Sequence, residues 1–379
     1  MARYLFITWN GSGNQNPTLG VAQALSACGH DIAFAGYASQ RERITRHGFR
    51  FTVLEKANAM LHQATGGDFI ATTLSGVWVT AAHLDDVPDA AARETPDVLV
   101  VDCLLFGALA AAELHHLPAV VLVHSAPGLQ VPPQGPFEQL VLRDPVNRLR
   151  AAAGLAPVAT MWDNWAHFPT LCASLPLLDP LAALVPEAFT YVGPLQETVP
   201  PSGWHAPWPV DDSRPLVLVN YSAAPAWDQT SRLQRTLDGL ANEPVRVLVT
   251  AETTDSSHLA VPANAVVVPF VPHAEILPQT AVTVTHAGHG TVTAALAHGV
   301  PLVCLPNVTS DQPALAAQVA ALGAGIALDG DTASPAAIGR AVITTLTDSS
   351  FTSAARRLAG AIDAAQASKT AATWLEAHV

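Results

Sequence analysis

The feature that most constrains this chain is a repeated alternation of short, apolar, β-rich runs with Ala- and Leu-rich segments of helical pattern. This alternation is typical of parallel sheets covered by helices on both faces, because a crossover between parallel strands usually contains a helix. The runs form two series: residues 3–8, 31–36, 50–55, 97–102, 119–124 and 189–193, then 216–221, 245–251, 265–270, 281–287, 301–306 and 325–329. The sequence therefore predicts an α/β protein with two doubly wound domains.

A proline-rich stretch without periodicity, residues 193–215, separates the two series. Such a stretch cannot form a packed strand or helix. We expect an N-terminal domain at 1–200, a linker at 201–214 and a second domain at 215–355. No strand pattern follows residue 356, so the tail, 356–379, is expected to form helices that pack back on the first domain.

The charge balance argues against two classes of partner. The chain carries 18 basic and 31 acidic residues, a formal charge of -13, and has no basic stripe, so neither nucleic acid nor an anionic membrane is an expected partner. The sequence shows no signal peptide and no long apolar segment, which favours a cytoplasmic protein. We expect a monomer or a homodimer, without another protein as partner. The four scattered cysteines are expected to be small buried side chains in a reducing compartment.

The sharpest motif is VTVTHAGHGTVTAALAHGVPLVCLP, residues 282–306. A strand is predicted to end at Thr285, with His286 at its carboxyl edge, and Gly288 and Gly290 allow a close turn into a helix beginning near Thr291. Backbone N–H groups, a helix dipole and an imidazole then surround one point, which suits a diphosphate. The alternative is a tightly packed turn in which His286 only caps backbone groups.

The first strand leads into a second glycine-containing turn, GSGNQNPTLGVAQAL, residues 11–25. Asn16 is predicted as the N-cap of a helix and Pro17 as its first residue. The turn lacks the third glycine of a dinucleotide-binding fingerprint. Asp329 and Asp331 have the spacing of an Asp-x-Asp metal motif, but their position between a strand and a helix favours a turn and cap.

The segment FVPHAEILPQTAVTVTHAGHGTVTAALAHGVPLVCLPNVTSDQPALAAQVAALGAG, residues 270–325, resembles the donor-binding region of family 1 glycosyltransferases of the GT-B fold. It is most similar to the bacterial enzymes that glycosylate natural products such as antibiotics. The resemblance extends over the whole chain, through the opening turn and YVGP before the linker. It implies two Rossmann-like domains facing across a cleft and a metal-independent, inverting transfer from a nucleoside-diphosphate sugar, with no other cofactor.

Carried over by position, the resemblance implies a set of donor-binding residues. Val271 and His273 would border the nucleotide base, and His286 would contact the diphosphate. The β-phosphate would receive donors from Gly288, Gly290 and Thr291, and the sugar hydroxyls would be held by Asp311 and Gln312. Ser222 and Ala223 stand where relatives usually have Gly followed by Ser or Thr, and the approach to Asp311 is one residue longer than usual.

The resemblance also locates a departure at the catalytic base. Relatives usually carry His, or in some subfamilies Asp, three residues before the loop proline, and this chain has Asn14 there. An amide cannot take a proton near neutral pH. Asp102 ends a strand where relatives keep the Asp that orients this His, so we favour Asp102 as base or orienting carboxylate. Three alternatives stay open: His124 substitutes as base, the acceptor needs little help, or Asp102 and His124 only cap and pack.

Aromatic residues in irregular segments of the first half suggest an acceptor site, although such residues also fill cores. They are Phe69, Trp78, Trp162, Trp165 and the neighbouring Phe168. The expected reaction is transfer of a sugar, with a deoxysugar and a thymidine donor favoured by the resemblance, to a hydrophobic, aromatic or polyketide-like small molecule. The alternatives are a GT-B sugar-nucleotide epimerase and, because of Asn14, a non-catalytic sugar-nucleotide binder.

Overall fold

The computed structural model describes residues 1–11, 13–63, 68–221, 229–251, 254–308 and 311–379. The chain divides into two compact units, and each is described by itself. Unit 1 contains Met1–Thr198 together with Gln366–Val379, and unit 2 contains Val199–Ala365. The proline-rich stretch between residues 192 and 215 contains neither helix nor strand.

Unit 1 is built on a parallel sheet with the strand order β3-β2-β1-β4-β5-β6-β7. The strands are β1 (Arg3–Ile7), β2 (Asp31–Gly36), β3 (Arg50–Val53), β4 (Val98–Asp102), β5 (Ala119–Val123), β6 (Thr170–Cys172) and β7 (Phe189–Tyr191). The chain builds outward from β1 to β3 and then returns to the other side of β1 with β4. The direction of winding therefore reverses between β1 and β4.

Helices cover both faces of this sheet. They are α1 (Gln15–Ala27), α2 (Arg41–Arg46), α3 (Glu55–Gln63), α4 (Phe69–Thr73), α5 (His83–Glu94), α6 (Phe106–Leu114), α7 (Pro127–Gln130), α8 (Arg143–Ala152), α9 (Met161–Trp165) and α16 (Ala367–Glu376), with short turns η1 (Ala38–Gln40), η2 (Leu74–Trp78), η3 (Glu138–Leu142), η4 (Pro176–Leu178) and η5 (Ala182–Leu184).

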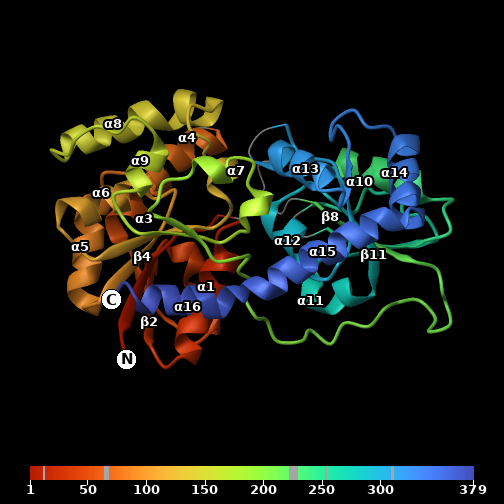
Figure 1. Ribbon diagram of the computed structural model, residues 1–379, viewed down its shortest axis with the longest axis horizontal. Helices are drawn as coiled ribbons and strands as arrows, with labels where there is room; N and C mark the ends of the chain where they lie inside the picture. The colour runs from red at the N-terminus through yellow and green to blue at the C-terminus, as the bar shows by residue number, and fades with distance from the viewer. Residues whose placement is uncertain (12, 64–67, 222–228, 252–253, 309–310) are drawn as a thin grey trace. The chain divides into compact units, whose positions relative to one another are not determined.

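Successive residues of the central strands enter different cores, as the two-residue period of a strand requires. Leu5 and Ile7 pack with α5, α6 and α9, whereas Tyr4 and Phe6 pack with α1 and α16. Figure 1 shows α16, the last helix of the chain, lying beside α1. The C-terminal segment is thus part of the core of unit 1.

Helix α1 begins earlier than the sequence predicted. Its first residue is Gln15, and Asn14, not Asn16, occupies the N-cap position, without a side-chain capping hydrogen bond. Pro17 falls within the first turn, where its missing N–H removes no helical hydrogen bond. The prediction was wrong because Asn16 lies inside the helix, where its side-chain oxygen accepts a hydrogen bond from Arg43 Nη2 and caps no backbone N–H.

Unit 2 repeats the architecture with the parallel strand order β10-β9-β8-β11-β12-β13. Its strands are β8 (Leu216–Asn220), β9 (Arg246–Thr250), β10 (Ala265–Val268), β11 (Thr280–Thr285), β12 (Leu302–Cys304) and β13 (Gly325–Ala327), and its helical segments are α10 (Thr230–Leu240), α11 (His273–Ile276), η6 (Leu277–Gln279), α12 (His289–Ala297), α13 (Gln312–Ala321), α14 (Pro335–Thr347) and α15 (Ser349–Ala365). Here the winding reverses between β8 and β11. The predicted fold class, two doubly wound α/β sheets, is confirmed.

Three of the four cysteines, Cys103, Cys172 and Cys304, are buried as expected, and all four are free. The expectation was wrong for Cys28, which is exposed because it lies just past the end of α1. Within the part of the chain that the structure describes, no helix combines the length and apolarity needed to cross a membrane.

Candidate active site

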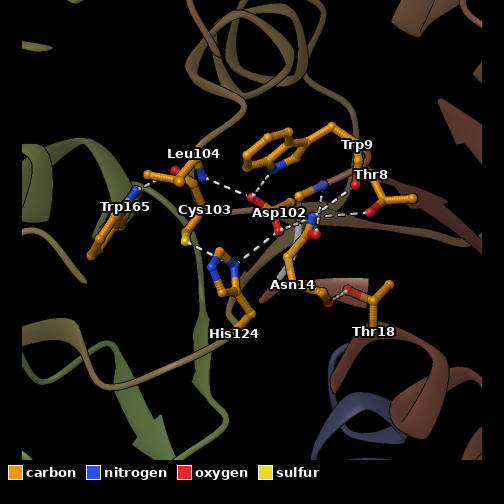
Figure 2. Close-up of polar contacts among 10 residues, drawn as sticks. Thr8, Trp9, Asn14, Thr18, Asp102, Cys103, Leu104, His124 and Trp165 are labelled. Atoms are coloured by element: carbon orange, nitrogen blue, oxygen red, sulfur yellow. Dashed lines mark hydrogen bonds and ion pairs between the residues drawn. The ribbon is translucent and has the colours of Figure 1, made fainter. Parts of the chain in front are cut away.

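The three predicted catalytic residues meet at the carboxyl edge of the unit 1 sheet. Asn14 lies in the loop after β1, Asp102 is the last residue of β4, and His124 directly follows β5. Parallel strands end at the same edge, and ligands of open α/β sheets bind at this edge where the winding reverses. Figure 2 shows the three side chains directed toward one another.

Asp102 is buried, with 2% of its surface exposed, and each of its two carboxylate oxygens accepts two hydrogen bonds. Oδ1 accepts from Trp9 Nε1 at 3.1 Å and the Leu104 amide at 3.0 Å. Oδ2 accepts from Asn14 Nδ2 and His124 Nδ1, each at 3.0 Å. Burial alone would raise the pKa of Asp102, but the electrostatic and hydrogen-bonding interactions of these neighbours hold it below its ordinary value.

Asn14 joins its own loop to this carboxylate. Besides Asp102, its Nδ2 donates to the Trp9 carbonyl at 3.0 Å, and its Oδ1 accepts from the Gly11 amide at 3.1 Å. Only 1% of Asn14 is exposed. Asp102 is not the N-cap of α6, whose N-cap position belongs to Leu105. The capping alternative for Asp102 was therefore wrong.

His124 presents one ring nitrogen to the carboxylate. Its Nδ1 lies 3.0 Å from Asp102 Oδ2 and 3.7 Å from Cys103 Sγ. Its Nε2 has no hydrogen-bond partner among the residues that the structure describes. The ring is largely buried. An Asp–His pair of this kind holds the imidazole in one orientation and favours the tautomer protonated at Nδ1.

Asp102, Cys103 and His124 also place ligand atoms within 4.8 Å of one another, a spacing that a metal ion could use. One feature argues against a metal. Both Asp102 oxygens are occupied by hydrogen bonds. The cluster fits proton chemistry better.

The reversal point of the unit 2 sheet carries the predicted diphosphate residues. His286 directly follows β11, Ala287 adopts a left-handed conformation with φ +64°, and Gly288 occupies the N-cap position of α12. A Cβ on Gly288 would lie 2.5 Å from His286 Nε2, so a glycine is required for the imidazole to lie against this turn. The His286 ring therefore lies beside the N-terminus of α12, where the helix dipole is positive.

The surroundings of His286 disfavour the charged form of its imidazole. Its burial, reinforced by the positive charge of Arg232, lowers its pKa to about 4. Its Nδ1 has no hydrogen-bond partner among the described residues. In the first turn of α12, nothing surrounds the Cβ position of Gly290 within 4 Å, and the Thr291 hydroxyl donates to Asn220 Oδ1 at 3.1 Å.

Gln312, the first residue of α13, is held by a chain of polar side chains. Its Oε1 accepts from the amide and the Nδ2 of Asn307. The Oδ1 of Asn307 accepts from Arg232 Nη1 at 2.6 Å, and Arg232 also pairs with Asp331 at 3.0 Å. Asp311 lies at the N-cap position of α13 and is half-buried.

The Asp329–Asp331 segment is a turn, as the sequence favoured. The Asp329 carboxylate accepts the amides of Asp331 and Thr332. A Cβ on Gly330 would lie 2.0 Å from the Pro306 carbonyl, so the turn packs closely on the strand end.

The remaining donor residues are less closely grouped. Val271 is buried, and His273 begins α11 with a pKa lowered to about 4, mainly by burial and then by His298. Ser222 and Ala223 lie outside the described residues.

The predicted acceptor aromatics are mostly in the core of unit 1. Trp78, Trp162 and Trp165 are 4%, 4% and 0% exposed, and Trp165 Nε1 donates to the Cys103 carbonyl at 2.8 Å. These indoles fill the space between the helices and the sheet, as large apolar side chains commonly do. Phe168 packs against the same core. Phe69, on α4, is the exposed member of the set, at 46%.

Sequence reasoning missed three residues of these sites: Trp9, Arg232 and Asn307. Trp9 lies two residues after β1, but nothing in the sequence showed that its indole reaches a strand end 93 positions away. Arg232 belongs to an amphipathic helix, in which the inward direction of one arginine is not evident. A buried arginine usually has several acceptors, and here Gln229, Asn307, Gly330 and Asp331 supply them.

Comparison with known proteins gives three further findings. The family described as "Erythromycin biosynthesis protein CIII-like, C-terminal domain" matches residues 234–376. The chain is 30% identical to 4'-demethylrebeccamycin synthase of Lentzea aerocolonigenes, over 94% of each protein. Similar solved structures include the glycotransferase of kitacinnamycin (21% identity, TM-score 0.80, 100% and 99% of the two chains) and the glycosyltransferase VinC in complex with dTDP (20%, 0.72, 99% of each).

Proposed function

This chain belongs to the GT-B glycosyltransferases of antibiotic biosynthesis, and on that premise we propose that it transfers a sugar with inversion, without a metal ion, from a nucleoside diphosphate to a hydrophobic small molecule. The observation that carries the donor half of this proposal is the buried His286, which lies in the turn between β11 and α12 and whose Nδ1 has no hydrogen-bond partner among the described residues. A ring N–H beside a helix N-terminus stabilises the charge that develops on a departing diphosphate.

The sugar is held by Asp311 and Gln312 in this proposal. The Oε1 of Gln312 is occupied by Asn307, so the amide presents its Nε2 donor to a sugar hydroxyl. Val271 and His273 border the base, while Gly288, Gly290, Thr291 and Ser222 surround the diphosphate. A thymidine donor is supported by the dTDP that VinC binds, and a deoxysugar by the antibiotic family.

On the acceptor side, Phe69 offers an exposed aromatic ring on α4. Trp78, Trp162 and Trp165 support the acceptor region from the core and fix the elements that border it. A large aromatic or polyketide-like alcohol fits an apolar surface with few charges.

The test is to incubate the protein with UDP-glucose or dTDP-glucose, with and without 2-naphthol or 2-naphthalenemethanol, and to measure nucleoside diphosphate release. Release is expected only with acceptor, EDTA is expected to leave the rate unchanged, and NMR of the product is expected to show a β-glucoside formed from the α-linked donor. Conversion of the sugar nucleotide without acceptor would instead identify an epimerase. Donor binding without turnover across the panel would identify a non-catalytic binder.

A further inference from the structure

We propose that the general base of this enzyme is His124, oriented by Asp102, and that the usual base position has been converted in Asn14 into a structural support for that pair. The inference rests on the proposed glycosyl transfer and names the group that removes the acceptor proton.

Asp102 is a poor direct base because its acceptor capacity is already used. A carboxylate offers about four lone-pair sites, and the four donors on Asp102 come from Trp9, Leu104, Asn14 and His124. A substrate hydroxyl could approach only by displacing one of them. The same bonds lower the pKa of Asp102, which weakens it as a base.

His124 offers the free proton acceptor that Asp102 lacks. Its Nδ1–H donates to Asp102 Oδ2, which leaves the lone pair on Nε2. No described residue bonds to Nε2, since both printed contacts of this ring are made by Nδ1. Because the ring follows β5, it lies at the same sheet edge as the loop after β1. An Asp–His pair is therefore present, but its imidazole comes from the end of β5 and not from the loop after β1, where position 14 lies.

The contacts of Asn14 explain why an asparagine is tolerated at the usual position of the base. A residue at this position must complete the hydrogen bonding of Asp102 and hold the loop after β1, and the amide does both. A second imidazole here would compete with His124 for Oδ2. The amide supplies the N–H without adding a second titratable group.

The proposed step balances without any further reactant. The acceptor O–H proton moves to His124 Nε2 while the acceptor oxygen bonds to the anomeric carbon. The bond from that carbon to the phosphate oxygen breaks, and its electron pair leaves with the nucleoside diphosphate. Asp102 stabilises the imidazolium that forms.

The first test is the tautomer of His124, which needs no substrate. In the ¹⁵N-labelled protein near neutral pH, long-range ¹H–¹⁵N correlation is expected to show a protonated Nδ1 and an unprotonated Nε2, with the signals assigned by their loss in His124→Asn. Protonation at Nε2 would overturn the proposal.

The second test is turnover of the His124→Asn variant, whose amide can still donate to Asp102. With glucose donors we expect about a 10²- to 10⁴-fold loss of kcat for 2-naphthalenemethanol. The loss for 2-naphthol should be much smaller, because this acceptor releases its proton more readily. Donor affinity, measured by calorimetry, should not change. The matched control is His116→Asn, an exposed position of unit 1 with φ +52°, which asparagine tolerates.

The outcomes separate the two proposals. If the unmodified protein releases no nucleoside diphosphate with any acceptor, the proposed function fails. If it turns over and His124→Asn does so equally well on the alcohol, the assignment of the base fails. Equal losses on both acceptors, or loss of activity with EDTA and recovery with Zn²⁺, would also overturn it, because the first indicates a structural role and the second a metal at Asp102, Cys103 and His124.

Discussion

At the scale of single residues, the two sheet edges use histidine in different ways. Burial and the positive charge of Arg232 lower the pKa of His286, whereas His124 is held at Nδ1 by the carboxylate of Asp102. The first arrangement suits hydrogen bonding to an anion, and the second suits proton transfer. The distinction depends on the neighbours of each ring.

Replacing His286 with alanine is expected to lower kcat about 10²-fold, because one donor to the departing diphosphate is lost. Nucleoside diphosphate affinity should also fall, as measured by calorimetry. His258→Ala, at an exposed position of unit 2, is the control. Unchanged kinetics in His286→Ala would place the diphosphate elsewhere.

The sequence could locate Asp102 and His124 at strand ends, because strand patterns are local. It could not show that they touch, since their contact joins β4 and β5 across 22 positions. Nor could it show that Asn14 bonds Asp102 rather than capping α1, because an asparagine before a helix has both options. The sequence could therefore predict where these residues lie along the strands and loops, but not which side chains they contact.

At the scale of elements, the same limit applies to strands. Each predicted strand occurs, because an apolar run bounded by turn residues can be recognised from neighbouring positions alone. Strand β6, Thr170–Cys172, was missed because three residues between irregular segments give no periodicity. It forms only because β5 and β7 offer hydrogen-bonding edges on both sides.

Helix α16 is expected to contribute much of the stability of unit 1 through Leu375, which is fully buried in the core with α1. Leu375→Ala should lower the free energy of unfolding of this unit by about 2–5 kcal/mol. Urea unfolding followed by tryptophan fluorescence measures this loss. Leu184→Ala, at a position that is 70% exposed, should change stability by less than about 0.5 kcal/mol. Equal effects of the two variants would contradict the packing role of α16.

At the scale of the whole molecule, buried neutral histidines make stability depend on pH. The folded-state pKa is lowered from 6.5 to about 3 for His83 and to about 4 for His273 and His286, chiefly by burial. Below pH 6.5 the unfolded chain therefore binds protons that the folded protein excludes. The contribution of these histidines to stability is therefore complete above this pH and falls between pH 6.5 and about 4.

We expect the free energy of unfolding to fall between pH 7 and pH 5, with each of these histidines contributing at most about 1.4 kcal/mol per pH unit. Urea titrations at several pH values measure the slope. His286→Asn should reduce it, because one buried imidazole is removed. A slope near zero across this range would show that these rings are protonated, or exposed, in the folded protein.

The return of the chain at Gln366 has a consequence for biosynthesis. This residue, with φ +44°, separates α15 of unit 2 from α16 of unit 1. Unit 2 is thus an uninterrupted insertion into unit 1. During translation the unit 1 sheet emerges from the ribosome first, yet the part of α1 that packs on α16 stays uncovered until the whole of unit 2 has been synthesised. The unit that is translated second is therefore the first that can fold to completion.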